Sequence, residues 1–338
     1  MPPPGPEPVP QVPPLIRDLG WAFARTRVFQ TAIQLGLFAR LAAGPRTPAA
    51  LADEAGWSRR GTRMLLEALA ALGLLERRDR RFALTADARR FLVPDSPNYL
   101  GHAFEDDRRW RAWSELPECV RGGRPTARGG AERDPGAFFA PLVRSLHVTH
   151  AAAAAAAARV LTAGRRPGAR ILDLACGSGV WGIALARADP AARVTAQDFA
   201  SVLELTRGFV AEAGLTDRFS WLPGDLDQFD PGEASFDLVL LGHIVHSLGA
   251  RRFRALLPRL HRALVPGGRL AIADMVPDDD RTGPPFPLLF ALNMLVHTEE
   301  GDVFSRAEYA EMLAEAGFGP PAAHDLGSHS PLLVAERG

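Results

Sequence analysis

Residues 171–182 (ILDLACGSGVWG) run from an apolar stretch into closely spaced glycines. Glycines at the carboxyl end of a strand allow a tight turn, and they let the backbone approach a ligand at the start of the next helix. Asp198 ends the next apolar stretch, where a carboxylate can accept hydrogen bonds from ribose hydroxyls. The segment therefore predicts a binding site for a nucleoside-containing cofactor.

The same glycines, with Gly182 as the third, also satisfy the G-x-G-x-x-G pattern of dinucleotide-binding enzymes. Three further features favour another cofactor. Asp173 precedes the glycines within the strand, residues 224–226 (GDL) offer a polar and an apolar side chain to an adenine, and residues 266–268 (PGG) form a turn before the fifth strand. A nicotinamide-dependent oxidoreductase is the weaker alternative, because the sequence has no second catalytic motif for it.

Together these segments resemble the motif series of class I S-adenosylmethionine methyltransferases. From about Leu15 to its C-terminus, the chain resembles the bacterial and plant small-molecule O-methyltransferases that carry an N-terminal dimerisation domain. The resemblance implies S-adenosyl-L-methionine as the cofactor and S-adenosyl-L-homocysteine as its product. It also implies that the glycine loop holds the methionine moiety, Asp198 the ribose, and the pair Asp225 and Leu226 the adenine. The predicted cofactor contacts are Asp173, Gly177, Ser178, Gly179, Asp198, Phe199, Gly224, Asp225, Leu226 and Gly242.

The resembling family also has a catalytic base, a histidine just after the fourth strand in a motif of the form L-H-[DN]-W. Residues 240–248 (LLGHIVHSL) place His246 at the matching position, and Asp274 matches an acid that orients this base. A phenol with a pKa of about 10 is ionised only to about one part in a thousand at pH 7. A neutral imidazole can take that proton as the methyl group arrives. His243 is the nearest alternative for the base.

Two departures from the family pattern leave the base and the acceptor atom open. Ser247 and Leu248 replace the acidic or amide residue and the tryptophan of the motif, and Val303 falls at about the position of a second orienting acid. Some relatives methylate carbon or nitrogen, and a few use the same fold for other reactions. Methyl transfer to oxygen is the leading prediction. C- or N-methylation and a non-methylating enzyme are the alternatives.

The predicted acceptor pocket is lined by the helix after the fifth strand and by helices at the domain junction, as the resemblance implies. The helix predicted over residues 285–297 (PFPLLFALNMLVH) is rich in large apolar side chains, which are typical of small-molecule sites. The residues predicted to contact the acceptor are Phe139, His147, His243, Phe290 and Met294. Their mostly apolar character favours an aromatic or polycyclic molecule over a sugar or a small acid.

The elements that carry these residues predict an α/β catalytic domain over residues 166–338. Strands alternate with helices in this range, which predicts a Rossmann-like fold with a seven-stranded, mostly parallel sheet. Residues 101–165 are expected to form a helical connector that contributes to the acceptor pocket. Residues 1–14 are rich in proline, and we expect them to form a disordered tail.

Residues 15–100 predict a mostly helical, winged-helix-like dimerisation domain. One helix is expected from Leu15 to about Leu41, a second starts after the N-cap Thr47, and a third runs from the N-cap Ser58 to Leu75. Residues 78–84 are expected to form the wing. Through this domain the resemblance implies a homodimer. Apolar candidates for the interface are Phe29, Leu35 and Phe38.

The balance of 39 basic and 39 acidic residues gives a net charge of zero. This argues against nucleic acid or an acidic membrane surface as the main partner. A winged-helix regulator that presents Arg59, Arg60 and Arg63 to DNA is therefore a distant alternative. The two cysteines form no CxxC motif, and no metal site is predicted. The sequence shows no signal peptide and no apolar run of membrane-spanning length, so we expect a cytoplasmic protein.

Overall fold

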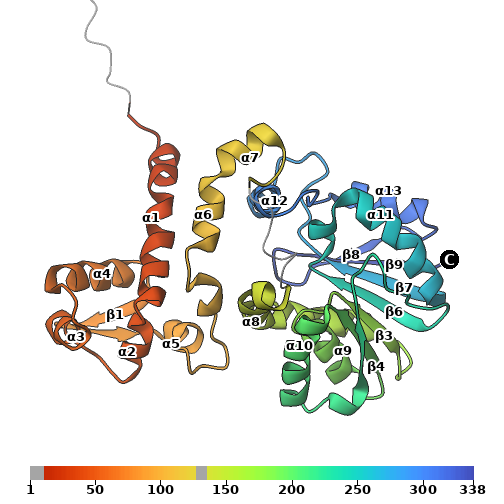
Figure 1. Cartoon of the computed structure of the whole chain (residues 1–338), viewed down its shortest axis with the longest axis horizontal. Coiled ribbons are helices and arrows are strands. Elements are labelled where there is room, and N and C mark those ends of the chain that lie inside the picture. Colours follow the sequence, from red (N-terminus) through yellow and green to blue (C-terminus); the bar gives the residue numbers. More distant parts are fainter. Residues whose placement is uncertain (1–10, 127–134) are drawn as a thin grey trace, which may run out of the picture. The chain divides into compact units, whose positions relative to one another are not determined.

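A computed structural model describes residues 11–126 and 135–338, and the side chains of residues 135–139 also lie outside the described part. The chain divides into two compact parts, one ending at Asp106 and the other beginning at Asp107. Each part has its own secondary structure and its own hydrophobic core (Figure 1).

The N-terminal part is a small helical domain with a two-stranded wing (Figure 1). Thr47 and Ser58 cap helices α3 and α4 as predicted, each accepting a hydrogen bond from a backbone N–H three residues on. Phe38, Leu66 and Phe82 lie in its buried core. Its elements are α1 (Pro14–Gln34), α2 (Leu37–Ala42), α3 (Pro48–Ala55), α4 (Arg59–Ala71), β1 (Leu75–Arg78), β2 (Arg81–Leu84), α5 (Ala86–Leu92) and the 3-10 turn η1 (Gly101–Phe104).

Three predictions for this domain are wrong. The single helix expected up to Leu41 breaks at Gly36, whose φ of 64° ends α1 and lets α2 begin in a new direction. Phe38 consequently turns inward and is only 1% exposed, so it belongs to the domain core and is not available to a partner. Leu35 remains 40% exposed. The helix from Ser58 also ends earlier than expected, at Ala71.

The C-terminal part is a three-layer α/β domain (Figure 1). Its sheet has seven strands and is mostly parallel, as the alternating pattern predicted. The strand order is β5-β4-β3-β6-β7-β9-β8, and β9 is antiparallel to both of its neighbours. Its strands are β3 (Arg170–Leu174), β4 (Arg193–Asp198), β5 (Phe219–Pro223), β6 (Phe236–Gly242), β7 (Leu264–Ala273), β8 (Ala322–His324) and β9 (Leu332–Glu336). Its helices are α6 (Arg108–Ser114), α7 (Leu116–Gly122), α8 (Pro135–Thr162), α9 (Val180–Ala188), α10 (Ala200–Glu212), the 3-10 turn η3 (Thr216–Arg218), α11 (Val245–Ala263), α12 (Pro285–His297) and α13 (Arg306–Glu315).

Alternate residues of the central strands face opposite layers of helices. Ile171 belongs to the core shared with α8, α9 and α10, whereas its neighbour Leu172 belongs to the core shared with α11 and α13. Because β3, β4, β6 and β7 are parallel, their carboxyl ends meet along one edge of the sheet. That edge carries the predicted site. No helix of the described residues is long and apolar enough to cross a bilayer.

Helix α11 begins at Val245, three residues after β6 ends at Gly242. Its first turn is separated from the rest by Gly249, which has φ 73° and ψ 168°. A Cβ atom at this position would lie 2.2 Å from the carbonyl oxygen of Glu300, so a side chain cannot be accommodated here. This start places His246 in the first turn of α11, directly after the sheet edge.

Candidate active site

The glycine loop between β3 and α9 has the backbone conformation that its glycines permit. Gly177 and Gly179 have φ values of 55° and 72°, in the left-handed region. The N–H of Gly177 donates to Asp198 Oδ2 at 2.9 Å, and the N–H of Phe199 donates to Asp198 Oδ1 at 2.8 Å. Asp198 therefore ties the loop to the end of β4, and each of its oxygens keeps a second lone pair for a ligand hydroxyl.

The backbone of this region faces space that a ligand can enter. A Cβ atom added at Gly177 or at Gly224 would meet no atom within 4 Å. Asp225 and Leu226, next in the chain, are partly exposed. Burial raises the pKa of Asp198 to about 6. A nucleoside with ribose hydroxyls fits this set, because its hydroxyls donate to a buried carboxylate that has few other partners.

Asp173 lies beneath the loop and does not face that space. Its side chain is 1% exposed, and Oδ2 accepts the N–H of Gly182 at 2.9 Å. The expectation that Asp173 touches the cofactor does not fit this burial; it positions the loop through the first turn of α9. Its Oδ1 is buried without a hydrogen-bond partner, and burial raises the pKa of Asp173 to about 7.

Replacing Asp173 by asparagine is expected to flatten the dependence of stability on pH. The carboxyl holds its proton up to about pH 7 in the folded chain but only up to its ordinary value of 3.8 when unfolded. Stability should therefore fall as pH rises across this window, by an amount on the order of a few kcal/mol. Denaturant unfolding of both proteins gives the free energy of unfolding at pH values between 4.5 and 8, in steps of about one pH unit, and hence this slope. An unchanged slope in Asp173→Asn would show that Asp173 is ionised in the folded protein.

Two glycines near the loop allow close packing. A Cβ atom at Gly182 would lie 2.7 Å from Asp173 Oδ2, and one at Gly242 would lie 2.5 Å from Nε1 of Trp181. Gly182, the third glycine of the dinucleotide-like pattern, thus allows α9 to pack closely against β3. Gly242, a predicted cofactor contact, lies at the end of β6 against Trp181.

His246 and Asp274 form a direct pair at the ends of β6 and β7. His246 Nδ1 lies 2.6 Å from Asp274 Oδ1, and the backbone N–H of His246 donates to Asp274 Oδ2 at 3.0 Å. Burial acts to raise the pKa of Asp274, but the adjacent His246 outweighs it and holds that pKa below its ordinary value. An ionised Asp274 accepts a hydrogen bond from Nδ1–H of His246, and the free lone pair of the ring is then on Nε2.

Among the residues that the structure describes, the second orienting acid has no counterpart beside this ring. Val303 is buried, and Glu300 instead forms an ion pair with Arg251 at 2.7 Å. The N–H of Asp302 donates to the carbonyl oxygen of His246 at 2.9 Å, so this loop fixes the backbone of the histidine. The ring itself is oriented by the single carboxylate of Asp274.

The structure adds a residue that the sequence reasoning missed. His150, on α8, stacks on His243 with 4.1 Å between ring centroids and an interplanar angle of 16°. Trp181 lies 5.9 Å from both rings. His150 directly precedes a run of eight alanines that covers the sheet. Helical spacing could have placed His150 on the sheet-facing side, but not beside the end of β6.

Two of the predicted acceptor contacts lie near His246. The Phe290 ring meets the His246 ring edge to face, with 4.9 Å between centroids. Met294 Sδ lies 4.0 Å from the hydroxyl of Ser247. Helix α12, which carries both, is tied to α6 by a hydrogen bond of 3.1 Å from Trp113 Nε1 to Asn293 Oδ1. An apolar, aromatic wall thus stands beside the candidate base.

Two further predicted contacts, His147 and Phe139, are placed differently. His147 stacks on Phe209 of α10 at 4.1 Å, and its Nδ1 is buried without a hydrogen-bond partner. The structure therefore places His147 between α8 and α10 and does not bring it to His246. The side chain of Phe139 lies outside the described residues.

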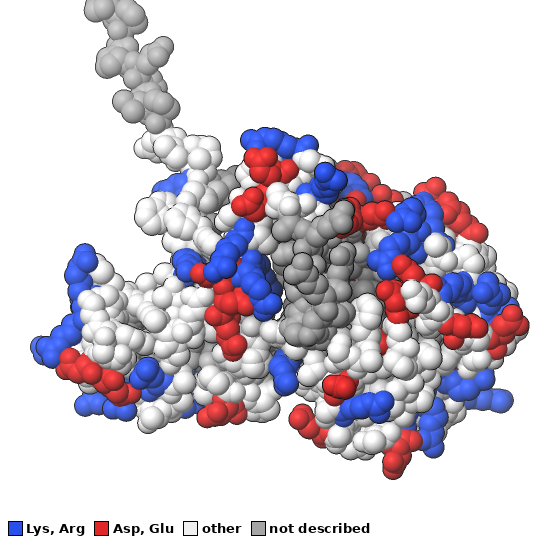
Figure 2. Space-filling model, in the orientation of Figure 1, with Lys and Arg blue, Asp and Glu red and all other residues white. Residues whose placement is uncertain are grey.

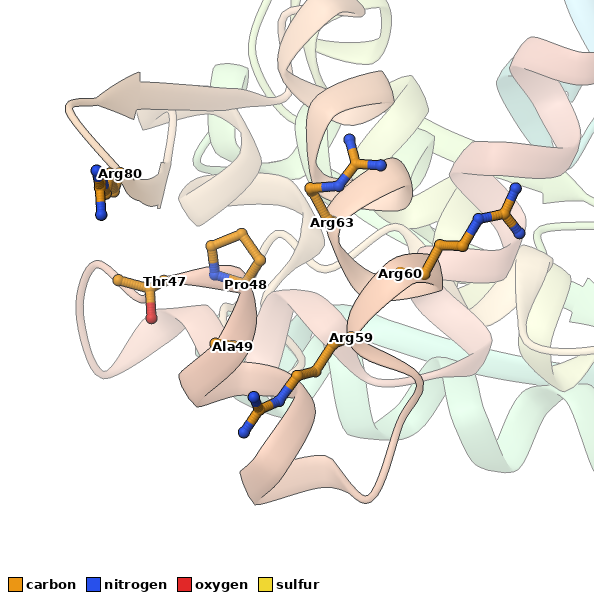
Figure 3. Close-up of a pocket in the computed structure, with 7 residues that line it drawn as sticks. All are labelled: Thr47, Pro48, Ala49, Arg59, Arg60, Arg63 and Arg80. Carbon is orange, nitrogen blue, oxygen red and sulfur yellow. The ribbon is translucent and has the colours of Figure 1, made fainter.

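Four arginines of the N-terminal domain border a hollow of about 520 Å³, namely Arg59, Arg60, Arg63 and Arg80 (Figure 3). Arg59 makes two hydrogen bonds to Asp53, at 2.8 and 2.9 Å, and Arg63 pairs with Glu67 at 2.6 Å. On the visible face of the domain, acidic and basic side chains are interspersed (Figure 2). This arrangement gives no support to a DNA-binding surface, which relies on unneutralised basic side chains.

Comparisons with known proteins agree with this architecture. Residues 151–319 match the O-methyltransferase domain, and residues 18–94 match the O-methyltransferase dimerisation domain. The chain is 35% identical to 3-hydroxy-5-methyl-1-naphthoate 3-O-methyltransferase of Streptomyces sahachiroi, over 93% of this chain and 91% of the relative. It is 32% identical to the tetracenomycin polyketide synthesis 8-O-methyl transferase TcmO of Streptomyces glaucescens, over 90% of each.

Among solved structures, PigF with SAH superposes with a TM-score of 0.86 at 25% identity, covering 97% of this chain and all of PigF. The glycine loop, the acid at the end of β4 and the dimerisation-domain match are thus found together in one chain. The chain belongs to the S-adenosylmethionine-dependent O-methyltransferase family that carries an N-terminal dimerisation domain.

Proposed function

We propose that this methyltransferase methylates a hydroxyl group of an aromatic or polycyclic secondary metabolite, with His246 as the general base. The observation that carries this proposal is the buried His246–Asp274 pair, which stands beside the aromatic wall of α12. One relative is named for 3-O-methylation of a hydroxynaphthoate, a fused aromatic ring that suits the same wall, and another for 8-O-methyl transfer in tetracenomycin polyketide synthesis.

When bound, S-adenosylmethionine supplies a methyl group on a positively charged sulfur. The chain's own groups then have separate tasks. Asp198 binds the ribose hydroxyls, and Asp225 and Leu226 hold the adenine. His246 Nε2 accepts the proton of the acceptor hydroxyl as the oxygen forms its bond to the methyl carbon, while the electron pair of the broken carbon–sulfur bond stays on sulfur. Asp274 stabilises the imidazolium that forms.

In this proposal the N-terminal domain forms the interface of a homodimer. Helix α1 exposes a set of large apolar side chains that its own domain does not cover, and such a surface is typical of an association site. These side chains are Leu15, Ile16, Leu19, Trp21 and Phe23. Leu35, at the end of the same helix, is also partly uncovered.

Methyl transfer to a panel of hydroxylated arenes tests the proposal. The purified protein is incubated with S-adenosylmethionine and naphthols, dihydroxynaphthalenes or hydroxynaphthoquinones, and products are detected by mass spectrometry. We expect methylated arene and S-adenosylhomocysteine in equal amounts. Methylation confined to amines, or S-adenosylhomocysteine formed without methylated arene, would contradict the proposal.

A further inference from the structure

The stacked rings of His150 and His243 have no assigned partner. Among the described residues, no side-chain hydrogen bond to either ring is formed, although both rings are partly buried. Their ring nitrogens are not among the fully buried unpaired polar atoms of the described residues, so they reach open space. Four accessible nitrogens that no described side chain occupies can bind a molecule that enters the site.

The backbone supports the same interpretation. His243 has a φ of 60°, a left-handed conformation that is uncommon for residues other than glycine. Such strained positions cluster at binding and catalytic sites. Here the left-handed backbone of His243 places its ring against that of His150, with Trp181 beside it.

The pair lies within reach of a molecule held at His246. The ring centroids of His243 and His246 are 6.2 Å apart, and one ring nitrogen of each lies within 4.8 Å of the other. A hydrogen bond joins heavy atoms at about 2.8 Å. Two oxygens on neighbouring positions of one arene, themselves about 2.7 Å apart when hydrogen-bonded, can therefore meet both histidines at once.

Both rings of the pair are neutral at physiological pH. Burial lowers the pKa of His150 to about 3 and that of His243 to about 4. A neutral imidazole has one donor and one acceptor nitrogen. The pair can thus bind a carbonyl or a hydroxyl oxygen without carrying a charge.

The reacting oxygen is a poor partner for this pair. His246 already provides the proton acceptor for that oxygen, with Asp274 behind it. If a second histidine donated a hydrogen bond to the same oxygen, it would stabilise the lone pair that attacks the methyl group and make that oxygen less nucleophilic. A separate oxygen of the acceptor is the better match.

We propose that His150 and His243 form a subsite that recognises a second oxygen of the acceptor, placed ortho or peri to the hydroxyl that is methylated. The acceptor class is then an arene with two neighbouring oxygen substituents. This inference rests on the proposed O-methylation beside His246. The methylated hydroxyl faces His246, and the neighbouring hydroxyl or carbonyl faces the stacked pair.

Paired acceptors and two phenylalanine variants test the subsite. The acceptors are 2,3-dihydroxynaphthalene against 2-naphthol and 1,8-dihydroxynaphthalene against 1-naphthol. The wild type should methylate the dioxygenated member of a pair with a kcat/KM about tenfold higher, as expected for one added hydrogen bond. His150→Phe and His243→Phe keep an aromatic ring but remove its nitrogens, and each should lower kcat/KM for the dioxygenated arene more than for the matching naphthol, so that the preference disappears.

Controls separate folding from recognition. His324→Phe, on β8, makes the same substitution far along the sheet order from β6 and should keep the wild-type preference. Asparagine tolerates a left-handed backbone better than phenylalanine, so His243→Asn serves if His243→Phe unfolds. Thermal unfolding and binding of S-adenosylhomocysteine are measured for every variant.

The outcomes distinguish this inference from the function on which it rests. If the wild type methylates none of the four arenes, the proposed aromatic acceptor class fails. If it methylates both members of a pair equally, or if the variants lose activity equally on both, the subsite is refuted. Weakened binding of S-adenosylhomocysteine in the variants would also refute it, because the pair would then serve the cofactor.

Discussion

Replacing His246 by alanine is expected to lower kcat for a phenolic acceptor by about 10²–10⁴-fold, the range that a positioned general base contributes. The reason lies in the pair with Asp274, which fixes the ring at 2.6 Å and directs the lone pair to Nε2. Without the ring, only the small ionised fraction of a phenol reacts. Initial rates at saturating cofactor and acceptor measure the effect.

A matched variant on the same helix controls for a general effect of losing an imidazole. His261, on α11, contacts Phe318 at 5.0 Å and lies on the side of the sheet away from α8. His261→Ala should keep kcat, and His246→Ala should keep its affinity for S-adenosylhomocysteine. A His246→Ala enzyme with unchanged kcat would show that positioning alone drives the reaction and would remove the base from the mechanism.

Replacing Asp198 by alanine is expected to weaken the binding of S-adenosylhomocysteine by about 10²-fold or more. Hydrogen bonds to a charged group contribute about 1.5–3 kcal/mol each, and two ribose hydroxyls are available to the carboxylate. The same substitution releases the N–H groups of Gly177 and Phe199, which loosens the loop. Calorimetric titration measures the dissociation constant. Asp217→Ala, on the turn η3 before β5, removes a carboxylate at the opposite edge of the sheet, where β4 begins, and should leave binding unchanged.

The affinity of the wild type should also depend on pH. The pKa of Asp198 is raised to about 6 by burial, and its ionised form accepts the ribose hydroxyls. Below that pH, binding requires the Asp198 carboxyl to lose its proton. The affinity for S-adenosylhomocysteine should therefore fall as the pH falls through about 6. Asp198→Asn should show little of this dependence. A wild-type affinity that is flat from pH 5 to 8 would contradict a direct role for the carboxylate.

The sequence predicted the sheet and its edge because local features determine them. Alternating apolar strands and helices imply parallel crossovers, and the glycines near residue 177 mark the loop at the end of β3. Asp274 was expected to lie beside His246 because the family resemblance matches it to an acid that orients the base. The structure shows this contact directly.

Contacts between residues that are distant in the sequence could not be predicted in the same way. His150 is distant in sequence from His243, and only the path of α8 across the sheet brings the rings together. The apolar spacing around Gly36 fitted one continuous helix, yet the left-handed glycine ends it and buries Phe38. Asp173 looked like a ligand contact by position, but the close approach of Gly182 holds it under the loop.

The destination of the methyl group tests the central claim most directly. The enzyme is supplied with S-adenosylmethionine carrying a carbon-13 methyl group and with a hydroxylated naphthalene, and the product is examined by carbon NMR. We expect a labelled carbon bonded to oxygen, in an amount that falls by the same factor as kcat in His246→Ala. A labelled carbon bonded to a ring carbon, or label that never reaches the arene, would contradict it.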